Sequence, residues 1–278
     1  MVTTMKLSFM PVGIRILVVA LAAHVALSAA FAAPGQRGGP AQMGAPPPVA
    51  TGTKLDPAEE KAYKAFYTAN QQDADTRITL GEAFIVKFPS SRYDESVYAG
   101  LVQAYYAKQD WKNFYGNADK ALALNPDDVG VLAIVGWMIP HAYNPDDPDA
   151  LKNLDKAETY EKHAIEVVGT LVKPATMTDD QFAAMKTERL TLAHSGLGLV
   201  YFRRQDFDNA VKELQQATQG AASPDPTDFY VLAVSLQRLN RQSDAGDAFN
   251  SCAQIAGPLQ DRCKQGADAA KKQGTPSK

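Results

Sequence analysis

The stretch Gly196–Ala217 reads GLGLVYFRRQDFDNAVKELQQA, and it decides the fold class. Apolar residues at three- and four-residue spacings lie on both sides of a polar break at Gln205-Asp206. That spacing places apolar side chains on one face of a helix, so the stretch predicts two antiparallel helices joined by a short turn. The small Gly198 on the first helix would let the second helix approach closely, and the small Ala210 and Ala217 on the second helix would admit a following helix. The result is a helical hairpin whose apolar face needs a neighbour.

The small and apolar positions of this hairpin recur along the chain at constant offsets. Three pairs are 35 residues apart: Leu197 and Leu232, Ala210 and Ala245, and Ala217 and Cys252. Two upstream pairs are 34 residues apart: Leu101 and Val135, and Tyr105 and Ile139. A repeat of this length predicts helix pairs that stack and bury a continuous apolar seam.

The run Leu197-Gly198-x-x-Tyr201, followed by Ala210 and Leu214, resembles the tetratricopeptide repeat, whose pattern is W-x2-L-G-x2-Y and then A-x3-F. The resemblance extends over residues 93–257 and is strongest in residues 191–220 and 227–257. It implies an all-α fold, a right-handed superhelical solenoid of antiparallel helix pairs, with about five repeats and a capping helix over residues 258–271.

Several copies depart from the pattern. Phe114 stands where the repeat has Ala, so packing there is expected to be wider. Residues 128–169 are degenerate, with Pro140 near the end of the first helix and a lengthened loop around Asn144. A second long connector at 173–177 precedes an extended first helix at 179–204. Residues 56–87 match only as two helices.

Two segments precede the repeat domain, which is expected over residues 56–272. Residues 1–32 have basic residues ahead of an apolar run and end in Ala30-Phe31-Ala32, the small-residue pattern of a signal-peptide cleavage site. Because the apolar run is nearly long enough to span a bilayer, an uncleaved membrane anchor is the alternative. Residues 33–55 are rich in Pro, Gly and Ala and are expected to form a flexible linker, and residues 273–278 a frayed tail. The sequence thus predicts a periplasmic or secreted protein.

Composition excludes several functional classes. With 28 basic and 31 acidic residues the net charge is −3, which argues against a nucleic-acid partner, because such proteins carry a basic surface for phosphates. The histidines lack H-E-x-x-H spacing, and Asp146, Asp147 and Asp149 lack the Gly and Glu of a calcium loop. No nucleophile motif is present either. We therefore expect no metal, no cofactor and no enzymatic activity.

The resemblance implies a partner-binding groove. In the family, the first helices of the pairs line a concave wall that commonly binds an extended peptide or a partner helix. The residues expected on that wall are Gln103, Tyr106, Trp137, Leu199, Phe202, Arg203, Tyr230, Val234 and Arg238. The alternative is that Trp137, Leu199 and Val234 are core residues between neighbouring repeats.

The two cysteines form a candidate disulfide. Cys252 and Cys263 lie five residues before and after Gly257-Pro258. Residues equidistant from the turn of an antiparallel helical hairpin can face each other, and an exported protein experiences oxidising conditions. The alternative is that Cys252 is simply the small residue of the repeat and Cys263 is incidental.

These features predict an exported scaffold or adaptor that binds a protein or peptide partner. Two other interpretations remain open from the sequence. One is an enzyme subunit with a site built from the long loops at Asn144 and Lys173, and the other is a self-assembling structural component.

Overall fold

The computed structural model describes residues 56–220 and 223–273. The predicted signal peptide and linker, and the tail from residue 274 onward, lie outside these residues. Every regular element within them is a helix, which confirms the all-α prediction. The helices are α2 (Pro57–Thr68), α3 (Ala74–Lys87), α4 (Asp94–Lys108), α5 (Trp111–Leu124), α6 (Val129–His141), α7 (Ala150–Thr170), α8 (Asp179–Arg203), α9 (Phe207–Gly220), α10 (Pro226–Arg238), α11 (Gln242–Gln254) and α12 (Gln260–Gln273).

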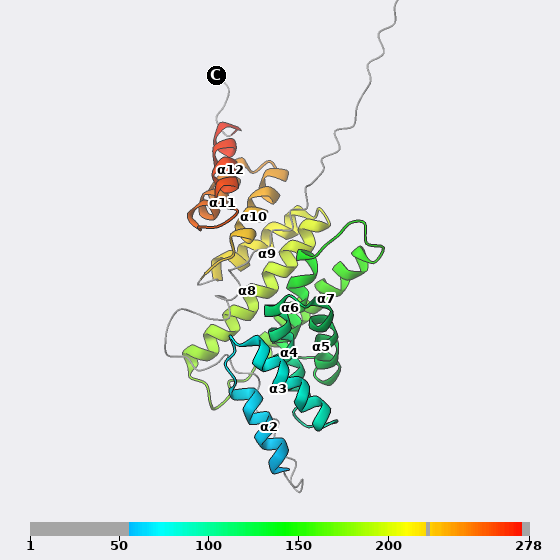
Figure 1. Ribbon diagram of the computed structural model, residues 1–278. Coiled ribbons are helices and arrows are strands. Elements are labelled where there is room, and N and C mark those ends of the chain that lie inside the picture. Colours follow the sequence, from blue (N-terminus) through cyan, green and yellow to red (C-terminus); the bar gives the residue numbers. More distant parts are fainter. Residues whose placement is uncertain (1–55, 221–222, 274–278) are drawn as a thin grey trace, which may run out of the picture.

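The helices follow one another along the molecule rather than surrounding a single centre (Figure 1). Consecutive helices form five antiparallel pairs in the described part of the chain: α2 packs on α3, α4 on α5, α6 on α7, α8 on α9 and α10 on α11, with α12 covering α11. Helix α8 also packs against both α6 and α7, so it joins the third and fourth pairs. This stacking of pairs is the architecture of a solenoid.

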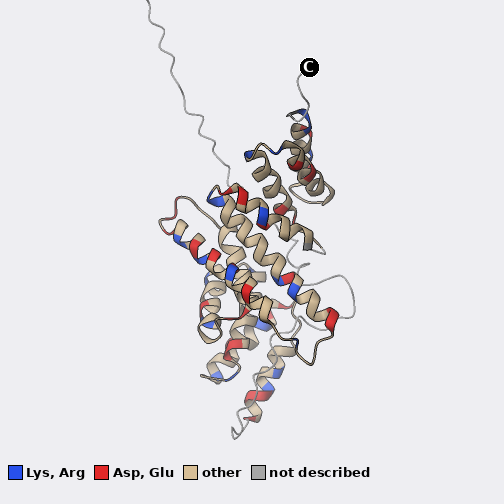
Figure 2. Cartoon of the chain, turned by 180° about the vertical axis from the view of Figure 1, so that it is seen from behind, with Lys and Arg blue, Asp and Glu red and all other residues tan. Residues whose placement is uncertain are grey.

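Charged residues of both signs are interspersed along the helices. Figure 2 shows short basic and acidic stretches alternating on the ribbon, with no helix given over to basic residues alone. The charge balance seen in the sequence therefore extends to the distribution of charge over the described part of the fold.

Local sequence signals set the helix starts. Asp56 caps α2 by accepting a hydrogen bond from the Ala58 backbone N–H at 2.8 Å, and Asp225 caps α10 in the same way. Thr178 and Gln181 form a reciprocal capping box at the start of α8. These caps supply acceptors for backbone N–H groups that have no partner inside the helix.

Small residues at the expected positions allow the helices of a pair to approach closely. A Cβ atom added to Gly198 would lie 2.5 Å from Leu214 Cγ, so α8 and α9 are in contact where the glycine lies. Ala210 and Ala217 on α9 are fully buried, as Leu214 is between them. The repeat spacing found in the sequence therefore corresponds to physical contact between helices.

We expect Gly198→Ala to lower the free energy of unfolding by about 1–3 kcal/mol, because the added methyl group would overpack against Leu214. Urea unfolding followed by circular dichroism measures this. Gly116→Ala in α5 is the matched control, since a Cβ there meets no atom within 4 Å and alanine favours a helix by up to about 1 kcal/mol. Equal stability of Gly198→Ala and the wild type would contradict the close approach.

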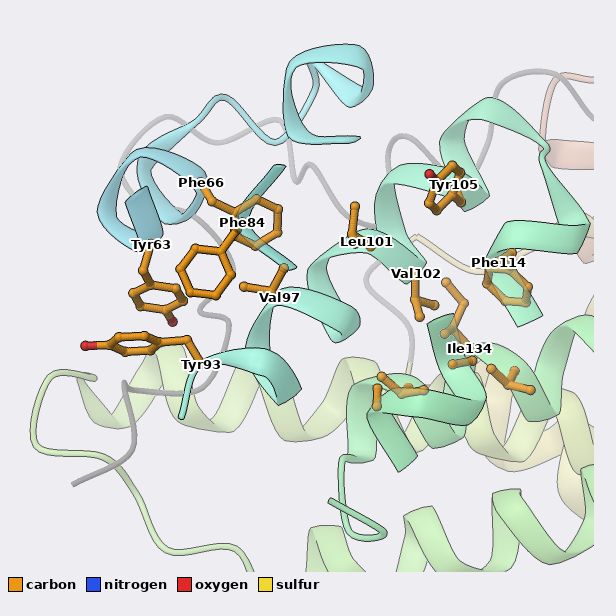
Figure 3. Packing of buried hydrophobic residues seen from close by; sticks show 14 residues of the cluster. Tyr63, Phe66, Phe84, Tyr93, Val97, Leu101, Val102, Tyr105, Phe114 and Ile134 are labelled. Carbon is orange, nitrogen blue, oxygen red and sulfur yellow. The ribbon is translucent and has the colours of Figure 1, made fainter. Parts of the chain in front are cut away.

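The first two pairs share an aromatic core (Figure 3). The rings of Tyr63 and Tyr93 are stacked 3.8 Å apart, and Phe84 meets Tyr93 edge-on. Phe114, at the position where the repeat has Ala, is completely buried and contacts the rings of Tyr106 and Tyr115. This core continues to Ile134 of α6, so it bridges from the second pair to the third.

The third pair departs from the repeat inside its core. Glu161 on α7 follows Ala157 by four residues and precedes Ala164 by three, which is the position that Leu214 holds in α9. Its side chain is completely buried, and neither carboxyl oxygen has a hydrogen-bond partner among the residues that the structure describes. A Cβ at Gly136 would lie 2.6 Å from Glu161 Cδ, and one at Gly196 would lie even closer to Oε1. The two glycines of α6 and α8 therefore make room for a buried carboxyl group.

The two irregular connectors surround the third pair. Helix α6 contains Pro140 one residue before its end, and residues 142–149 connect it to α7. Residues 171–178 connect α7 to α8, whose 25 residues include an N-terminal extension. No helix in the described part of the chain has both the length and the hydropathy to cross a membrane.

Candidate functional site

The residues expected on the wall lie on α4, α6, α8 and α10, the first helices of their pairs; we call these nine positions the first-helix wall. Gln103, Tyr106, Phe202, Arg203, Tyr230 and Val234 are half-buried, and Arg238 is exposed. Trp137 and Leu199, in contrast, are only 6% and 3% exposed, so the prediction of accessible side chains is wrong at these two positions. Both face neighbouring helices instead of solvent.

The buried indole group of Trp137 takes part in a series of hydrogen bonds that connects neighbouring repeats. Its Nε1–H donates to Ser195 Oγ at 3.1 Å, and the Ser195 hydroxyl donates to Asp228 Oδ1 at 2.6 Å. All three side chains are buried, and they belong to α6, α8 and α10. Leu199 is buried in the apolar cluster formed by the last two pairs. The chain of hydrogen bonds thus connects three successive first helices.

Two titratable groups in or beside this series of hydrogen bonds, Asp228 and His141, have shifted pKa values. Burial raises the pKa of Asp228 well above its usual range, and the negative charge of Asp225 raises it further, although the Ser195 hydrogen bond opposes the shift. Burial lowers the pKa of His141, whose ring lies 3.8 Å from that of Trp137. Burial thus favours the neutral form of both groups. The Ser195 hydroxyl lies between the Trp137 indole and the Asp228 carboxyl group, so it connects the two side chains.

Arg203 lies where the ends of α6 and α8 meet. Its Nε–H donates to the Pro140 carbonyl oxygen at 3.1 Å, and its guanidinium carbon lies 5.5 Å from the centre of the Tyr143 ring. Burial lowers the pKa of Arg203. The side chain thus fixes the start of the 142–149 connector while its two terminal nitrogens stay available.

The remaining wall residues lie over the apolar cluster of the last two pairs. Phe202, Tyr230 and Val234 pack against this cluster and are partly accessible. Phe202 meets Phe207 edge-on at 6.1 Å between ring centres, and the Arg238 guanidinium lies 6.0 Å from the same Phe207 ring. This part of the wall therefore combines aromatic surface with two arginines, the residue types that contribute most at protein interfaces.

Gln103 lines a cavity of about 230 Å³ that the 171–178 connector covers. The other walls of this cavity come from α4, the start of α6 and the first part of α8, and include Val102, Val131 and Met185. Tyr106 lies outside it, with its ring centre 6.5 Å from that of Trp137. The 171–178 connector therefore restricts access to the wall at Gln103.

A larger cavity, of about 340 Å³, lies beside the 142–149 connector. Tyr115, Tyr143, Asn144 and Asn153 contribute polar groups to it, together with Asp147 and Lys156. The Asp147 carboxylate accepts a backbone hydrogen bond from Asp149, and Lys156 pairs with Asp119 outside the cavity. These residues form neither a nucleophile–base pair nor a pair of facing carboxylates, so the arrangement favours no particular reaction.

The structure joins Cys252 and Cys263 by a disulfide, with 5.7 Å between their Cα atoms. Both residues are completely buried, and the bond links α11 to α12. Within the described residues, no group of three or more His, Cys, Asp or Glu side chains is arranged to hold a metal ion.

Sequence reasoning misses Ser195, Asp228 and Glu161. Asp228 belongs to the Asp225-Pro226-Thr227-Asp228 start signal, in which Asp225 alone is the cap. Glu161 could be found from the repeat register, since it replaces a large apolar residue between Ala157 and Ala164. Ser195 gives no such signal, because its role depends on residues from two other helices.

Comparison with solved structures finds similar helical repeat proteins. PilW, described as a widely conserved type IV pilus biogenesis factor, has 15% sequence identity and a TM-score of 0.51, over 79% of this chain and 91% of its own. A thermophilic TPR protein of Thermus thermophilus has 16% identity and a TM-score of 0.47, over 77% of this chain and 99% of its own. No protein-family model and no curated protein matches the sequence.

Proposed function

We propose that this chain, which has a tetratricopeptide-repeat fold, is an exported scaffold that binds a protein partner along the first-helix wall and performs no chemistry of its own. The observation that carries the proposal is the half-exposed aromatic and arginine surface of α8 and α10. Partly buried aromatic side chains next to arginine are typical of residues that dominate binding energy at interfaces. The solenoid displays them on one continuous surface.

The proposed location is the cell envelope, as a periplasmic or secreted protein. It rests on the charged, apolar and small-residue segments of residues 1–32, with membrane attachment as the alternative. The similar fold of a pilus biogenesis factor is consistent with a role in assembling envelope structures. Determination of the N-terminal residue of the mature protein tests the export step, and a start at Ala33 is expected.

We expect the double variant Phe202→Ala/Tyr230→Ala to lose most of the partner that the wild type captures from a native envelope extract. Truncation of interface aromatics commonly costs about 2 kcal/mol or more of binding free energy, a loss of about thirtyfold in affinity. Quantitative mass spectrometry of the captured proteins measures it.

The matched control for this experiment is Leu151→Ala, which removes an apolar side chain that is 66% exposed on α7, away from the wall. Because Tyr230 also packs edge-on against Phe249, thermal unfolding must show that the double variant is folded at the capture temperature. Equal recovery of every partner by the wild type and a folded double variant would refute the proposed surface.

A further inference from the structure

We propose that the partner segment bound by the first-helix wall is an extended acidic peptide whose carboxylates recur at every third residue and meet Arg203 and Arg238. This inference rests on the proposed function, because it names the chemistry of the partner at the same surface. Three observations carry it. Arg203 and Arg238 form no ion pair with a described residue, they occupy equivalent positions in successive repeats, and aromatic rings lie beside them.

Several arginines in the described part of the chain already have a carboxylate partner. Arg92 pairs with Glu60, Arg189 with Glu188, Arg204 with Glu158, and Arg241 with Asp244. Neither Arg203 nor Arg238 forms an ion pair with a residue that the structure describes, and the exposed Arg262 on α12 shares this property. Arg203 and Arg238 differ from Arg262 in lying on the wall beside aromatic rings, where they are available to an external anion.

The two arginines occupy equivalent positions in successive repeats. They are 35 residues apart, the same offset that separates Leu197 from Leu232, so they lie at the same point of α8 and α10. Neighbouring packed helices are about 8–10 Å apart, and an extended chain advances about 3.3–3.6 Å per residue. One repeat therefore corresponds to about three residues of an extended peptide, which gives the spacing of the carboxylates.

Nearby rings and carboxyl groups are consistent with this assignment. Phe202 packs on Phe207, whose ring lies beside the Arg238 guanidinium, so these rings offer an apolar surface to the intervening peptide residues. Asp225 and Asp228 lie toward the His141 end of the wall, where burial lowers the pKa of His141 and favours its neutral form although the charge of Asp225 opposes this shift. We therefore assign no carboxylate of the peptide to His141.

A fluorescein-labelled peptide of Asp-Leu-Ser repeated four times is the probe, with binding followed by fluorescence anisotropy in 50 mM salt. One comparison peptide replaces each Asp by Asn, and another has the same composition with its four Asp residues contiguous. We expect the full-length wild type to bind the regularly spaced peptide about tenfold more tightly than either comparison, with an affinity that falls as salt is raised.

Arg238→Gln is expected to weaken binding of the spaced peptide about tenfold, and Arg203→Gln/Arg238→Gln about a hundredfold. Arg262→Gln is the matched control, because Arg262 is an exposed arginine on α12, outside the wall. Since Arg238 is exposed and contacts the Phe207 ring only at 6.0 Å, its replacement is not expected to disturb folding.

Equal binding of the Asn peptide, or an equal loss in Arg262→Gln and Arg238→Gln, would overturn the proposal. Equal binding of the contiguous peptide would overturn the spacing. If Phe202→Ala/Tyr230→Ala loses its envelope partner while the wild type shows no preference among the peptides, the acidic partner is refuted and the scaffold function stands.

Discussion

Replacing Glu161 by Gln is expected to stabilise the folded protein at neutral pH, by a margin that grows as the pH rises. The Glu161 carboxyl group is completely buried between Gly136 and Gly196 without a hydrogen-bond partner, and burial raises its pKa well above the ordinary value of 4.5. The folded protein therefore keeps a proton that the unfolded chain releases.

The sign of the effect follows from this difference in protonation. Below pH 4.5 both states hold the proton, and Glu161 adds no pH-dependent penalty. Above that value the unfolded chain gains stability by ionising, so the free energy of unfolding falls by about 1.4 kcal/mol per pH unit until the folded-state pKa is reached. A glutamine side chain cannot ionise, so the Glu161→Gln variant lacks this slope.

Urea unfolding of the wild type, Glu161→Gln and Glu161→Met at pH 4.5, 6 and 7.5 measures the effect. Gln has nearly the same shape as Glu and isolates the ionisation, whereas Met also removes the two unpaired oxygens and is expected to be more stable than Gln at every pH. Glu158→Gln is unsuitable as a control because the half-buried Glu158 pairs with Arg204, and Glu166→Gln serves instead, since Glu166 is exposed and its contact with His163 is long, at 3.9 Å. Parallel pH profiles for the wild type and Glu161→Gln would contradict the buried neutral carboxyl.

Removing the disulfide is expected to have the second large effect. The double variant Cys252→Ala/Cys263→Ala should lose about 3 kcal/mol of unfolding free energy, because the bond closes a short loop and restricts the unfolded chain. Alanine keeps a small residue at both buried positions, as Ala217 is at the position of Cys252 in the preceding repeat. Packing is therefore disturbed little.

The loss should be concentrated in α12. This last helix packs mainly on α11, with few contacts to α10, so its attachment depends on the bond and on the packing of Phe249 against Gly266. Amide hydrogen exchange should show lost protection over Gln260–Gln273 and unchanged protection in α4 and α8. Ser251→Ala, at an exposed position of α11, is the control. Unchanged exchange of α12 in the double variant would show that apolar packing alone holds the helix.

Much of the fold could be predicted because its determinants are local and periodic. The caps at Asp56, Thr178 and Asp225 act within one helical turn, and the small residues Gly198 and Ala210 act within one hairpin. Caps and small residues occur at fixed spacings from the helices that need them, so these features can be recognised in the sequence alone. The extended first helix expected at 179–204 is predictable for the same reason, and α8 differs from it by one residue.

The candidate site was less predictable because exposure depends on neighbouring repeats. The register places Trp137 and Arg203 on the same wall, yet Trp137 is buried with Ser195, while Arg203 stays accessible beside Tyr143. A helical pattern gives the direction of a side chain from its own helix. Whether another helix covers it depends on residues far along the chain, as with Trp137 and Ser195, which are 58 positions apart.

The sequence by itself determined that this chain is a stack of helical hairpins, because helix periodicity, caps and small residues at a constant offset are short-range properties. Only the tertiary structure decided which wall side chains remain accessible, where a carboxyl group is buried and which arginines of the wall lack a carboxylate. These depend on distances between residues far apart in the chain, and burial, hydrogen bonding and ion pairing are set by such distances.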